Sequence, residues 1–354
     1  MSLRVGLLYN LKTERPQEEE EPPDADAELD SEETIAAITQ ALIWAGHEVI
    51  PIEADLDAYA KLRNTRIDVA MNIAEGRRGP SRESQMPAML DMLGIPYTGS
   101  GVLTLAVALD KPVTKKLLQY HGVPTPRFVT VPQGKGIPDL DLNYPLFVKP
   151  AHEGSSKGIT PASKVKTELE LARQVEVIHR LYKQDALVEE FVEGREFTVG
   201  ILGNDSPYML PIGEICFNEV PEEHKGIYTR QFKTEWYEDK YFLCPAPISE
   251  ETATLLYDVA YRAYCAVGCV DVARLDIRLS AEGQPYVLEI NPLPGLCPKS
   301  SDLPRMAAVA GLSYNMLINA ILNYTLQRYG LPPSDHILSN TNRLTLRLNE
   351  GRPR

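Results

Sequence analysis

The sequence lacks three features that would place it in particular classes of protein. Its 354 residues include no apolar run of membrane-spanning length, and the apolar stretch from Met1 to Tyr9 is too short for a signal peptide. Its five cysteines are odd in number and have no paired metal-ligand spacing, so they indicate neither a disulfide framework nor a zinc site. We therefore expect a protein of the reducing cytoplasm without a membrane partner.

Clustered basic residues are also missing, although charge is unevenly placed. The chain has 36 lysines and arginines, 49 acidic residues and a formal net charge of −13. Eleven of the acidic residues lie between Glu14 and Glu33, with a single arginine among them. Nucleic-acid binding requires a basic surface and is not expected. The acidic segment 13–30 is too charged to bury a core face, and we expect it to form a mobile loop.

Residues 1–104 alternate short apolar strands with helical segments, which predicts a small α/β domain built on a parallel sheet. Ser31 is a suitable N-cap for a helix that Gly46 would end. The strands are expected at 3–9, 48–52 and 69–73. Glu75 follows the third strand, at the edge where parallel sheets bind ligands, so its loop is either a substrate site or a solvated turn.

The rest of the chain predicts two α+β subdomains, at 105–186 and 187–330, and a surface tail at 331–354. Apolar and polar alternation indicates strands at 128–131, 144–150, 187–192 and 194–199. Helical periodicity indicates single helices over 102–121, 249–267 and 303–324, whereas the aromatic and basic segment 227–236 is expected to be a loop.

Lys149 lies at the end of the strand 144–150 and is followed by the glycine- and serine-rich segment 153–158. Small residues leave backbone N–H groups free to cradle a phosphate, and the lysine would add a point charge. The segment does not have the spacing of a P-loop, and the same glycines would suit a plain hairpin turn with positive φ. Both interpretations stand at this point.

The most informative stretch is a predicted β-hairpin over residues 274–295. Period-2 geometry places Arg274 with Asp276, and Glu289 with Asn291, on one face of each strand. Strand pairing would bring Asp276, Glu289 and Asn291 together as oxygen ligands, which suits Mg²⁺ beside substrate phosphates. A hairpin with a solvated charged face is the alternative. The strand around Glu289 is otherwise apolar, however, and charges in a buried strand need partners.

Four segments, taken in order, resemble the ATP-grasp superfamily and, within it, the D-alanine–D-alanine ligases. They are Val-Lys-Pro with Glu-Gly-Ser-Ser-x-Gly at 148–158, Glu-Glu-Phe-Val-Glu-Gly-Arg-Glu-Phe-Thr-Val at 189–199, Arg-x-Asp at 274–276 and Leu-Glu-Ile-Asn-Pro-x-Pro-Gly at 288–295. The similarity covers residues 67–323. It implies an N-terminal α/β domain and two α+β ATP-grasp subdomains that sandwich ATP, in an enzyme of peptidoglycan and cell-wall biosynthesis that forms a homodimer.

The resemblance also implies a reaction. Such ligases use ATP to phosphorylate the carboxylate of one D-alanine, and the amine of a second D-alanine then attacks the acyl phosphate. ADP and phosphate are released and a dipeptide remains. The implied cofactors are ATP and Mg²⁺, with Mn²⁺ as a substitute. The implied ATP-binding residues are Lys111, Lys149, Glu153, Gly154, Ser155, Ser156, Glu189, Glu190, Phe191, Val192, Glu196 and Lys233.

The same resemblance assigns the remaining site residues. Asp276, Glu289 and Asn291 would bind the metal, and Ser155 would form a lid over the γ-phosphate and substrate. Arg274 and the N–H of Gly295 would stabilise the tetrahedral oxyanion, while Lys233 would reach the transferring phosphate. Ser300 and the backbone of Ser301 would bind the carboxylate of the acceptor.

The first-substrate half departs from the family pattern. The glycine-rich loop whose glutamate contacts the first D-alanine is replaced by the acidic segment, so Glu28, Glu32 and Glu33 are all candidates for that role. Glu75 stands where the ligases have histidine, and Arg230 aligns with a substrate-side tyrosine. A cation at Arg230 and an anion at Glu75 would change which substrate groups are paired.

Three functions therefore remain open. The first is a D-alanine–D-alanine ligase, and the second is a ligase of the same architecture that joins a different amino acid or small carboxylate. The third is a nucleotide-binding regulator without catalysis. The third would be favoured by loss of a metal ligand or phosphate lysine, and the sequence retains all of these residues.

Overall fold

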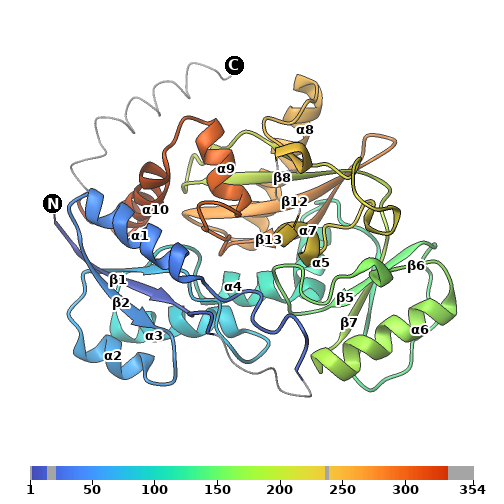
Figure 1. Ribbon diagram of the computed structural model, residues 1–354, viewed down its shortest axis with the longest axis horizontal. Coiled ribbons are helices and arrows are strands. Elements are labelled where there is room, and N and C mark those ends of the chain that lie inside the picture. Colours follow the sequence, from blue (N-terminus) through green and yellow to red (C-terminus); the bar gives the residue numbers. More distant parts are fainter. Residues whose placement is uncertain (1, 14–20, 236–238, 334–354) are drawn as a thin grey trace.

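The computed structural model describes residues 2–13, 21–235 and 239–333, so most of the predicted tail lies outside the described residues. Three sheets follow one another along the chain, one parallel and two antiparallel (Figure 1). The fold class is therefore mixed α/β, as the sequence predicts.

The N-terminal sheet is parallel, with strand order β2-β1-β3. Its elements are β1 (Arg4–Tyr9), α1 (Glu32–Trp44), β2 (Glu48–Glu53), α2 (Ala58–Asn64), β3 (Val69–Asn72) and α3 (Gln85–Leu93). The predicted signals at both ends of the first helix are confirmed. The Ser31 side chain accepts a hydrogen bond from the backbone N–H of Thr34 at 3.2 Å, and Gly46 follows with φ of +84°.

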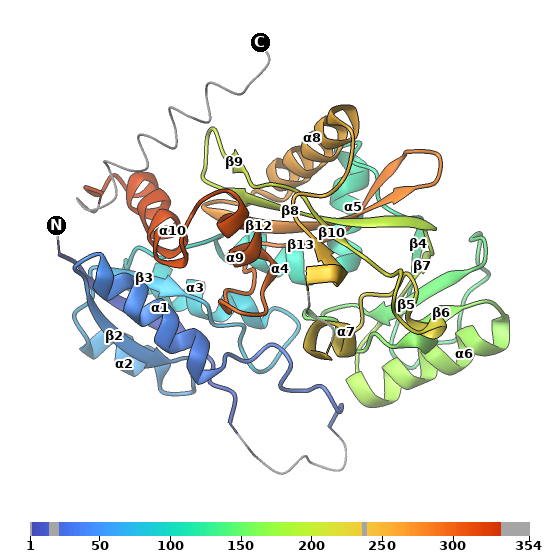
Figure 2. The ribbon, with the colours of Figure 1, turned by 45° about the horizontal axis from the view of Figure 1, so that its top comes forward.

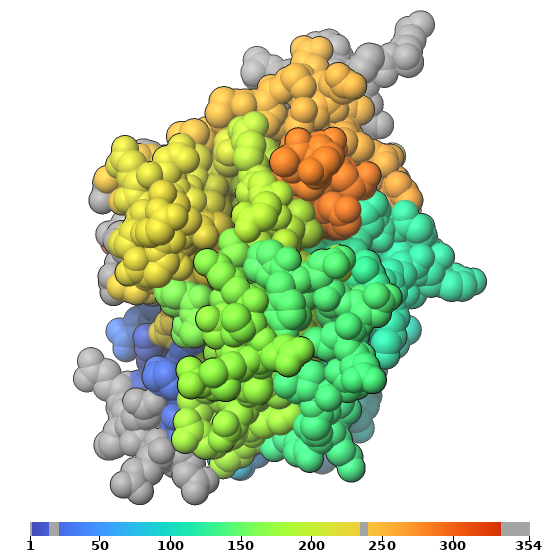
Figure 3. All heavy atoms as spheres, turned by 90° about the vertical axis from the view of Figure 1, so that its right-hand side faces the viewer, coloured from blue at the N-terminus to red at the C-terminus, as the bar shows by residue number. Residues whose placement is uncertain are grey.

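The central sheet is antiparallel, with strand order β4-β7-β5-β6. Its elements are β4 (Phe128–Val131), β5 (Leu146–Pro150), β6 (Lys164–Val165), α6 (Glu168–Val177) and β7 (Ala186–Glu190). Leu171 and Val175 of α6 pack with Leu146, Val148 and Val188 in one buried core. Seen from the side of this sheet, the chain between β10 and α8 (yellow) lies above it and to the left (Figure 3).

The C-terminal sheet follows the order β11-β10-β8-β12-β13, and β9 also pairs with β8. Its strands are β8 (Gly194–Leu202), β9 (Tyr208–Met209), β10 (Gly213–Ile215), β11 (Phe242–Leu243), β12 (Val272–Ser280) and β13 (Pro285–Asn291). The predicted hairpin is confirmed as β12 and β13. Asp276 pairs with Glu289 across the strands, and Arg274 pairs with Asn291.

The helices predicted after residue 100 are right in place, but two of them are wrong in continuity. The helix expected over 102–121 is two helices, α4 (Val102–Leu109) and α5 (Lys111–Tyr120). Asp110 interrupts it with φ −81° and ψ 89°, and its side chain caps α5 by accepting from the N–H of Val113 at 2.9 Å. Pro112 at the start of α5 has no N–H to continue a helix.

The helix expected over 303–324 is also two helices, α9 (Asp302–Val309) and α10 (Tyr314–Arg328). Gly311 at φ +82° ends the first, and Ser313 caps the second. The segment expected as a loop over 227–236 contains the short helix α7 (Arg230–Glu235), whereas α8 (Glu250–Val267) matches its prediction.

The N- and C-terminal parts share one core. Leu42 and Ile38 of α1 pack in the same buried cluster as Leu317 and Ile321 of α10, and the two helices lie side by side in both views (Figures 1 and 2). The Asn319 side chain donates to the carbonyl of Ala41 at 2.7 Å. The Arg328–Asp271 ion pair, at 2.8 Å, ties α10 to the start of β12.

The acidic segment does not behave as expected. Residues 14–20 lie outside the described part of the chain, but Glu28 is only 8% exposed and is packed against the central subdomain. The sequence predicts a mobile loop that is too charged to bury a core face, whereas the structure buries Glu28 of this segment. The reason is that Arg82 and Lys157, which lie far away in the sequence, supply the charges that make burial of this carboxylate possible.

Across the described ranges, no single helix is both long and apolar enough to cross a membrane. Among the described helices, the pair α9 and α10 meets that length and composition only when taken together, and the two are bent by 102° at the break between them.

Candidate active site

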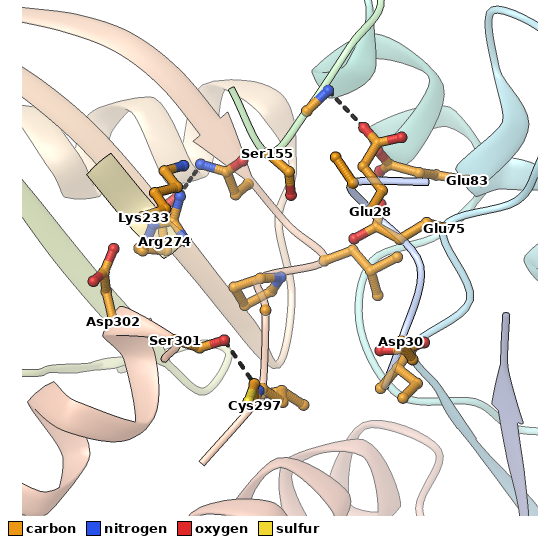
Figure 4. Close-up of a pocket in the computed structure, with 18 of the residues that line it drawn as sticks. Glu28, Asp30, Glu75, Glu83, Ser155, Lys233, Arg274, Cys297, Ser301 and Asp302 are labelled. Carbon is orange, nitrogen blue, oxygen red and sulfur yellow. Dashed lines mark hydrogen bonds between the residues drawn. The ribbon is translucent and has the colours of Figure 1, made fainter. Parts of the chain in front are cut away.

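A cavity of about 340 Å³ lies where the three parts of the chain meet (Figure 4). Its walls come from the N-terminal domain, the segment after β5, the α7 region and the residues that follow β13. Figure 4 shows the labelled acids Glu28, Asp30, Glu75 and Glu83 on one side, and Lys233, Arg274 and Asp302 on the other. Of the predicted site residues, this cavity collects Glu75, Lys111, Gly154, Ser155, Arg230, Lys233, Arg274, Glu289, Asn291, Gly295, Ser300 and Ser301.

A second cavity, of about 80 Å³, lies between the central and C-terminal sheets. Phe147 and Phe191 give it apolar walls, and their ring centroids are 6.0 Å apart. The predicted ATP residues that line it are Lys149, Ser156, Glu189, Glu190, Phe191, Val192, Glu196 and Lys233. Lys233 and Glu289 line both cavities, so the two spaces meet at these side chains. An apolar slot of this kind, edged by a few polar groups, suits a nucleotide base.

Three lysines and two glutamates form a charge cluster beside the junction, and all of them are buried except Glu289, which is partly exposed. Lys149 and Lys115 each contact a carboxylate oxygen of Glu189 at 2.8 Å, and Lys111 lies 3.2 Å from Glu289. Burial opposes ionisation of Glu189, but the ammonium groups of Lys115 and Lys149 outweigh burial and lower its pKa to about 2. Burial also lowers the pKa of Lys115 to about 8.

Sequence reasoning missed Lys115 as a site residue. The signal was present, because Lys115 lies four positions after Lys111 and therefore on the same face of α5. Its side chain is 2% exposed and also donates to the hydroxyl of Thr125 at 2.7 Å.

At the far end of the smaller cavity, Glu196 forms an ion pair with Arg278, and both side chains are buried. Arg278 also donates to the carbonyl of Gly226 at 2.9 Å. Glu190 has other partners. Its carboxylate accepts from the backbone N–H of Asn143 at 2.9 Å and pairs with Arg127 at 3.3 Å. The carboxylate of Glu196 is thus held in place by Arg278, which sequence reasoning did not assign to the site.

The predicted metal ligands come together on the hairpin. Asp276 accepts from Arg274 at 3.0 Å, from the Thr198 hydroxyl at 2.9 Å and from the Asn291 amide at 3.2 Å. Burial opposes ionisation of Asp276, but Arg274 lowers its pKa below the ordinary value. Among the described residues no group of three or more His, Cys, Asp or Glu side chains is arranged to hold a metal ion. The donor set here is instead two carboxylates and one amide.

The segment 153–158 adopts an unusual backbone, with φ of +47° at Ser155 and +58° at Ser156. The Ser156 hydroxyl donates to the carbonyl of Tyr228 at 2.8 Å, which joins this segment to the α7 region. Glu153 does not line either cavity. Its side chain contacts Lys157 at 2.5 Å and Arg82 at 3.1 Å, while its backbone carbonyl accepts from Lys111.

Of the three candidate glutamates in the acidic segment, only Glu28 lines the cavity. Both of its oxygens lie 2.7 Å from the guanidinium of Arg82, and one accepts from the N–H of Gly154 at 2.6 Å. Glu32 and Glu33 are exposed on the first turn of α1, and Glu33 pairs with Lys299 at 2.7 Å. Arg230, another predicted substrate residue, donates to the carbonyl of Asp24 at 3.3 Å.

The opposite end of the cavity is formed by the residues after β13. Ser301 accepts from the N–H of Cys297 at 3.0 Å, and a Cβ atom at Gly295 would lie only 2.8 Å from its hydroxyl oxygen. Asp302 is 4% exposed and accepts from the Tyr228 hydroxyl at 3.4 Å. Sequence reasoning missed Asp302 and Tyr228, because nothing local marks them as neighbours.

Comparison with known proteins gives independent evidence on the family of the chain. The model of the D-ala D-ala ligase C-terminus matches residues 117–323. The chain is 40% identical over 286 residues to a D-alanine–D-alanine ligase of Syntrophotalea carbinolica, covering 81% of this chain and 88% of that protein. It is 38% identical over 301 residues to an uncharacterized protein of Sinorhizobium fredii, covering 83% and 87% respectively.

A solved structure has the same fold. The crystal structure of the D-alanine–D-alanine ligase of Bacillus anthracis complexed with ATP superposes with a TM-score of 0.70, covering 92% of this chain and 98% of that one at 24% identity. The family model spans more than half of the chain, and the curated relatives match it over most of their length. The chain therefore belongs to the D-alanine–D-alanine ligase family, whose members are ATP-dependent ligases that form carbon–nitrogen bonds.

Proposed function

We propose that this ligase joins the carboxyl group of one amino acid to the amine of another, through an acyl phosphate, and that D-alanine or a related amino acid is the substrate. The observation that carries the proposal is the junction of the two cavities at Lys233 and Glu289. A nucleotide in the smaller cavity would point its phosphates through this junction into the larger one. The transferred phosphoryl group and the substrate carboxylate would then meet beside Arg274.

In the nucleotide half, the slot between Phe147 and Phe191 would hold the base, and Glu196 would accept from the ribose hydroxyls. Lys111 and Lys149 would exchange their present carboxylate partners for phosphate oxygens. Such an exchange keeps each buried ammonium paired, which avoids the cost of a lone buried charge.

Asp276, Glu289 and Asn291 would hold Mg²⁺, or Mn²⁺ in its place, since two carboxylates with an amide oxygen leave room for phosphate and water ligands. When bound, the metal would neutralise phosphate charge and so favour attack by the substrate carboxylate. Arg274 now pairs with Asp276, and neutralisation of that carboxylate would leave its guanidinium more available to the reacting group.

Arg274 and the N–H of Gly295 would stabilise the oxyanion that forms when the acceptor amine attacks the acyl carbon. In that step a carbon–nitrogen bond forms, the amine loses a proton, and the bond from the acyl carbon to the phosphate oxygen breaks. Ser300 and the backbone of Ser301 would hold the acceptor carboxylate. The lid segment around Ser155 would exclude water from the acyl phosphate.

A second candidate is a ligase of the same chemistry with a different donor. It is favoured by the acidic wall opposite Arg274, where Asp30, Glu75 and Glu83 line the cavity. D-Alanine has one ammonium group and an apolar methyl, and neither needs three carboxylates. The nucleotide half supports the reaction type, and the donor half supports a change of substrate.

Release of ADP by the purified protein with ATP and Mg²⁺ tests the proposal. D-Alanine, other D-amino acids and L-amino acids would be supplied singly and in pairs, and products identified by mass spectrometry. D-Alanyl-D-alanine would establish the first candidate, whereas another dipeptide-like product would establish the second. ATP binding without turnover on any amino acid would contradict both and favour a regulator.

A further inference from the structure

The donor end of the larger cavity holds more carboxylates than the chain neutralises. Four acids, Glu28, Asp30, Glu75 and Glu83, line this end. Glu28 is fully engaged, because Arg82 contacts both of its oxygens at 2.7 Å and the N–H of Gly154 reaches one of them. Its charge is therefore balanced before any substrate arrives.

Glu83 differs from Glu28 in having no such partner. It is 7% exposed and lines the cavity, yet among the residues that the structure describes no donor hydrogen-bonds to its carboxylate and no cation pairs with it. Glu75 lines the same wall and is equally without a donor or a cation from the described chain. A buried carboxylate normally has a partner, since its desolvation is costly.

The neighbouring cations are used elsewhere. Arg82 binds Glu28 and Glu153, and Lys111 binds Glu289. Lys12 also lines the cavity but is exposed at its rim. Within the described ranges no group of three or more acidic, histidine or cysteine side chains is arranged to hold a metal ion.

We propose that Glu75 and Glu83 form a subsite for a second ammonium group, so that the donor is a diamino carboxylic acid, such as ornithine or a shorter homologue. This inference rests on the proposed function, since it requires an amino acid in the donor position. The α-ammonium of the donor would lie near Glu28 and Asp30. The side-chain ammonium, with three N–H donors, would bridge the Glu75 and Glu83 carboxylates.

The protonation behaviour of the pair agrees with this role. Burial, together with the Glu28 carboxylate, raises the pKa of Glu83 to about 8. Burial and the Glu83 carboxylate likewise raise the pKa of Glu75 well above its ordinary value. The guanidinium of Arg82 opposes both pKa shifts, and Lys111 opposes the pKa shift of Glu83. Glu289 adds to the rise in the pKa of Glu83, and Asp30 adds to the rise in the pKa of Glu75. An arriving ammonium would displace protons from these groups.

The test compares substrates that differ only in the second ammonium. ADP release would be measured for the full-length protein with ATP, Mg²⁺ and either enantiomer of ornithine or of norvaline, each paired with D-alanine as acceptor. Norvaline has the carbon chain of ornithine without its terminal amine. We expect kcat/KM for ornithine to exceed that for norvaline by about tenfold or more, the scale of a charge-assisted hydrogen bond.

Two isosteric variants locate the effect. Glu75→Gln and Glu83→Gln keep side-chain volume, and each should reduce the ornithine-to-norvaline ratio by about tenfold, mainly through KM for ornithine. Glu176→Gln, on the exposed face of α6, is the matched control and should leave the ratio unchanged. Calorimetric binding of ornithine to the wild-type protein with ADP and Mg²⁺ should release protons, seen as a dependence of the heat on the buffer.

The outcomes separate this inference from the proposed function. Turnover with D-alanine and norvaline that equals turnover with ornithine would leave the ligase function intact and overturn the diamino subsite. An unchanged substrate ratio in both variants would also overturn it and make the acidic pair structural. Absence of turnover and of ornithine binding in the wild-type protein, with ATP still bound, would overturn the proposed function and the subsite together.

Discussion

The carboxylate of Glu28 accepts a hydrogen bond of 2.6 Å from the backbone N–H of Gly154, although 126 positions separate the two residues. This contact joins the acidic N-terminal segment to the segment 153–158, which the family resemblance makes a lid over the phosphates. Asp24 makes a second contact of the same kind, accepting from the N–H of Gly158 at 2.8 Å. The segment 153–158, which we propose as a lid, is therefore held from the N-terminal domain by two carboxylates.

Replacement of Glu28 by alanine should destabilise the fold. It would leave the guanidinium of Arg82 buried without its main partner, and loss of one member of a buried pair costs about 3–5 kcal/mol. Urea denaturation would measure the free energy of unfolding. Glu33→Ala is the control, because Glu33 pairs with Lys299 at the surface and should cost less than about 1 kcal/mol. Equal losses in the two variants would contradict the buried role of Glu28.

Asp24→Ala should loosen the lid without unfolding the protein. The Asp24 carboxylate accepts from the N–H of Gly158 and, at 2.9 Å, from the hydroxyl of Tyr182. Hydrogen exchange of the backbone amides between 153 and 158 should accelerate in this variant, and KM for ATP should rise. Tyr182→Phe removes only the second contact and should have a smaller effect. Unaltered exchange in Asp24→Ala would show that the lid is held by other contacts.

Gly295→Ala should impair catalysis while leaving ATP binding intact. A Cβ atom there would lie 2.8 Å from the hydroxyl oxygen of Ser301, so the N–H proposed for the oxyanion must shift. Loss of such a donor lowers kcat by about a hundredfold or more in other enzymes. Steady-state kinetics and calorimetric ATP binding would measure the two effects. Gly136→Ala is the control, because a Cβ atom at Gly136 meets nothing within 4 Å.

Arg278→Met should weaken ATP binding. The guanidinium of Arg278 holds the Glu196 carboxylate in the smaller cavity, and burial already raises the pKa of Glu196 above its ordinary value. Without Arg278 the carboxyl would stay protonated to higher pH and accept less well from a ribose. We expect the Kd for ATP, measured by calorimetry, to rise about tenfold. An unchanged Kd would mean that Glu196 does not contact the nucleotide.

The parts of the fold that the sequence predicts are those encoded locally. Period-2 alternation is sufficient for the β12–β13 hairpin and for the pairing of Asp276 with Glu289. The two interrupted helices carried local signals as well, since an aspartate before Lys111-Pro112 and a glycine at 311 favour a break. Apolar periodicity continued through both breaks and masked these signals.

The donor half of the site could not be predicted from local sequence patterns. Glu28 precedes α1, whereas Arg82 and Glu83 are neighbours in a short 3-10 helix before α3, and only the tertiary packing brings Glu28 to them. The acidic composition of residues 13–30 predicted a mobile loop, and the burial of Glu28 could not be foreseen because the compensating cations are distant in sequence. Charge pairing across domains is a property of the tertiary structure.

The raised pKa of Glu83 gives a pH dependence of stability with a defined sign. In the unfolded chain this carboxyl releases its proton near its ordinary value of 4.5, whereas in the folded protein burial holds the proton until about pH 8. Between these values the folded state binds more protons than the unfolded state, so Glu83 makes the free energy of unfolding fall as pH rises.

Glu83→Gln has no proton to lose and should remove this slope. The difference in unfolding free energy between Glu83→Gln and the wild-type protein should therefore grow from about pH 5 to about pH 8 and then level off. Urea denaturation at each pH would measure it, and parallel curves for the two proteins would contradict the burial of an ionisable Glu83.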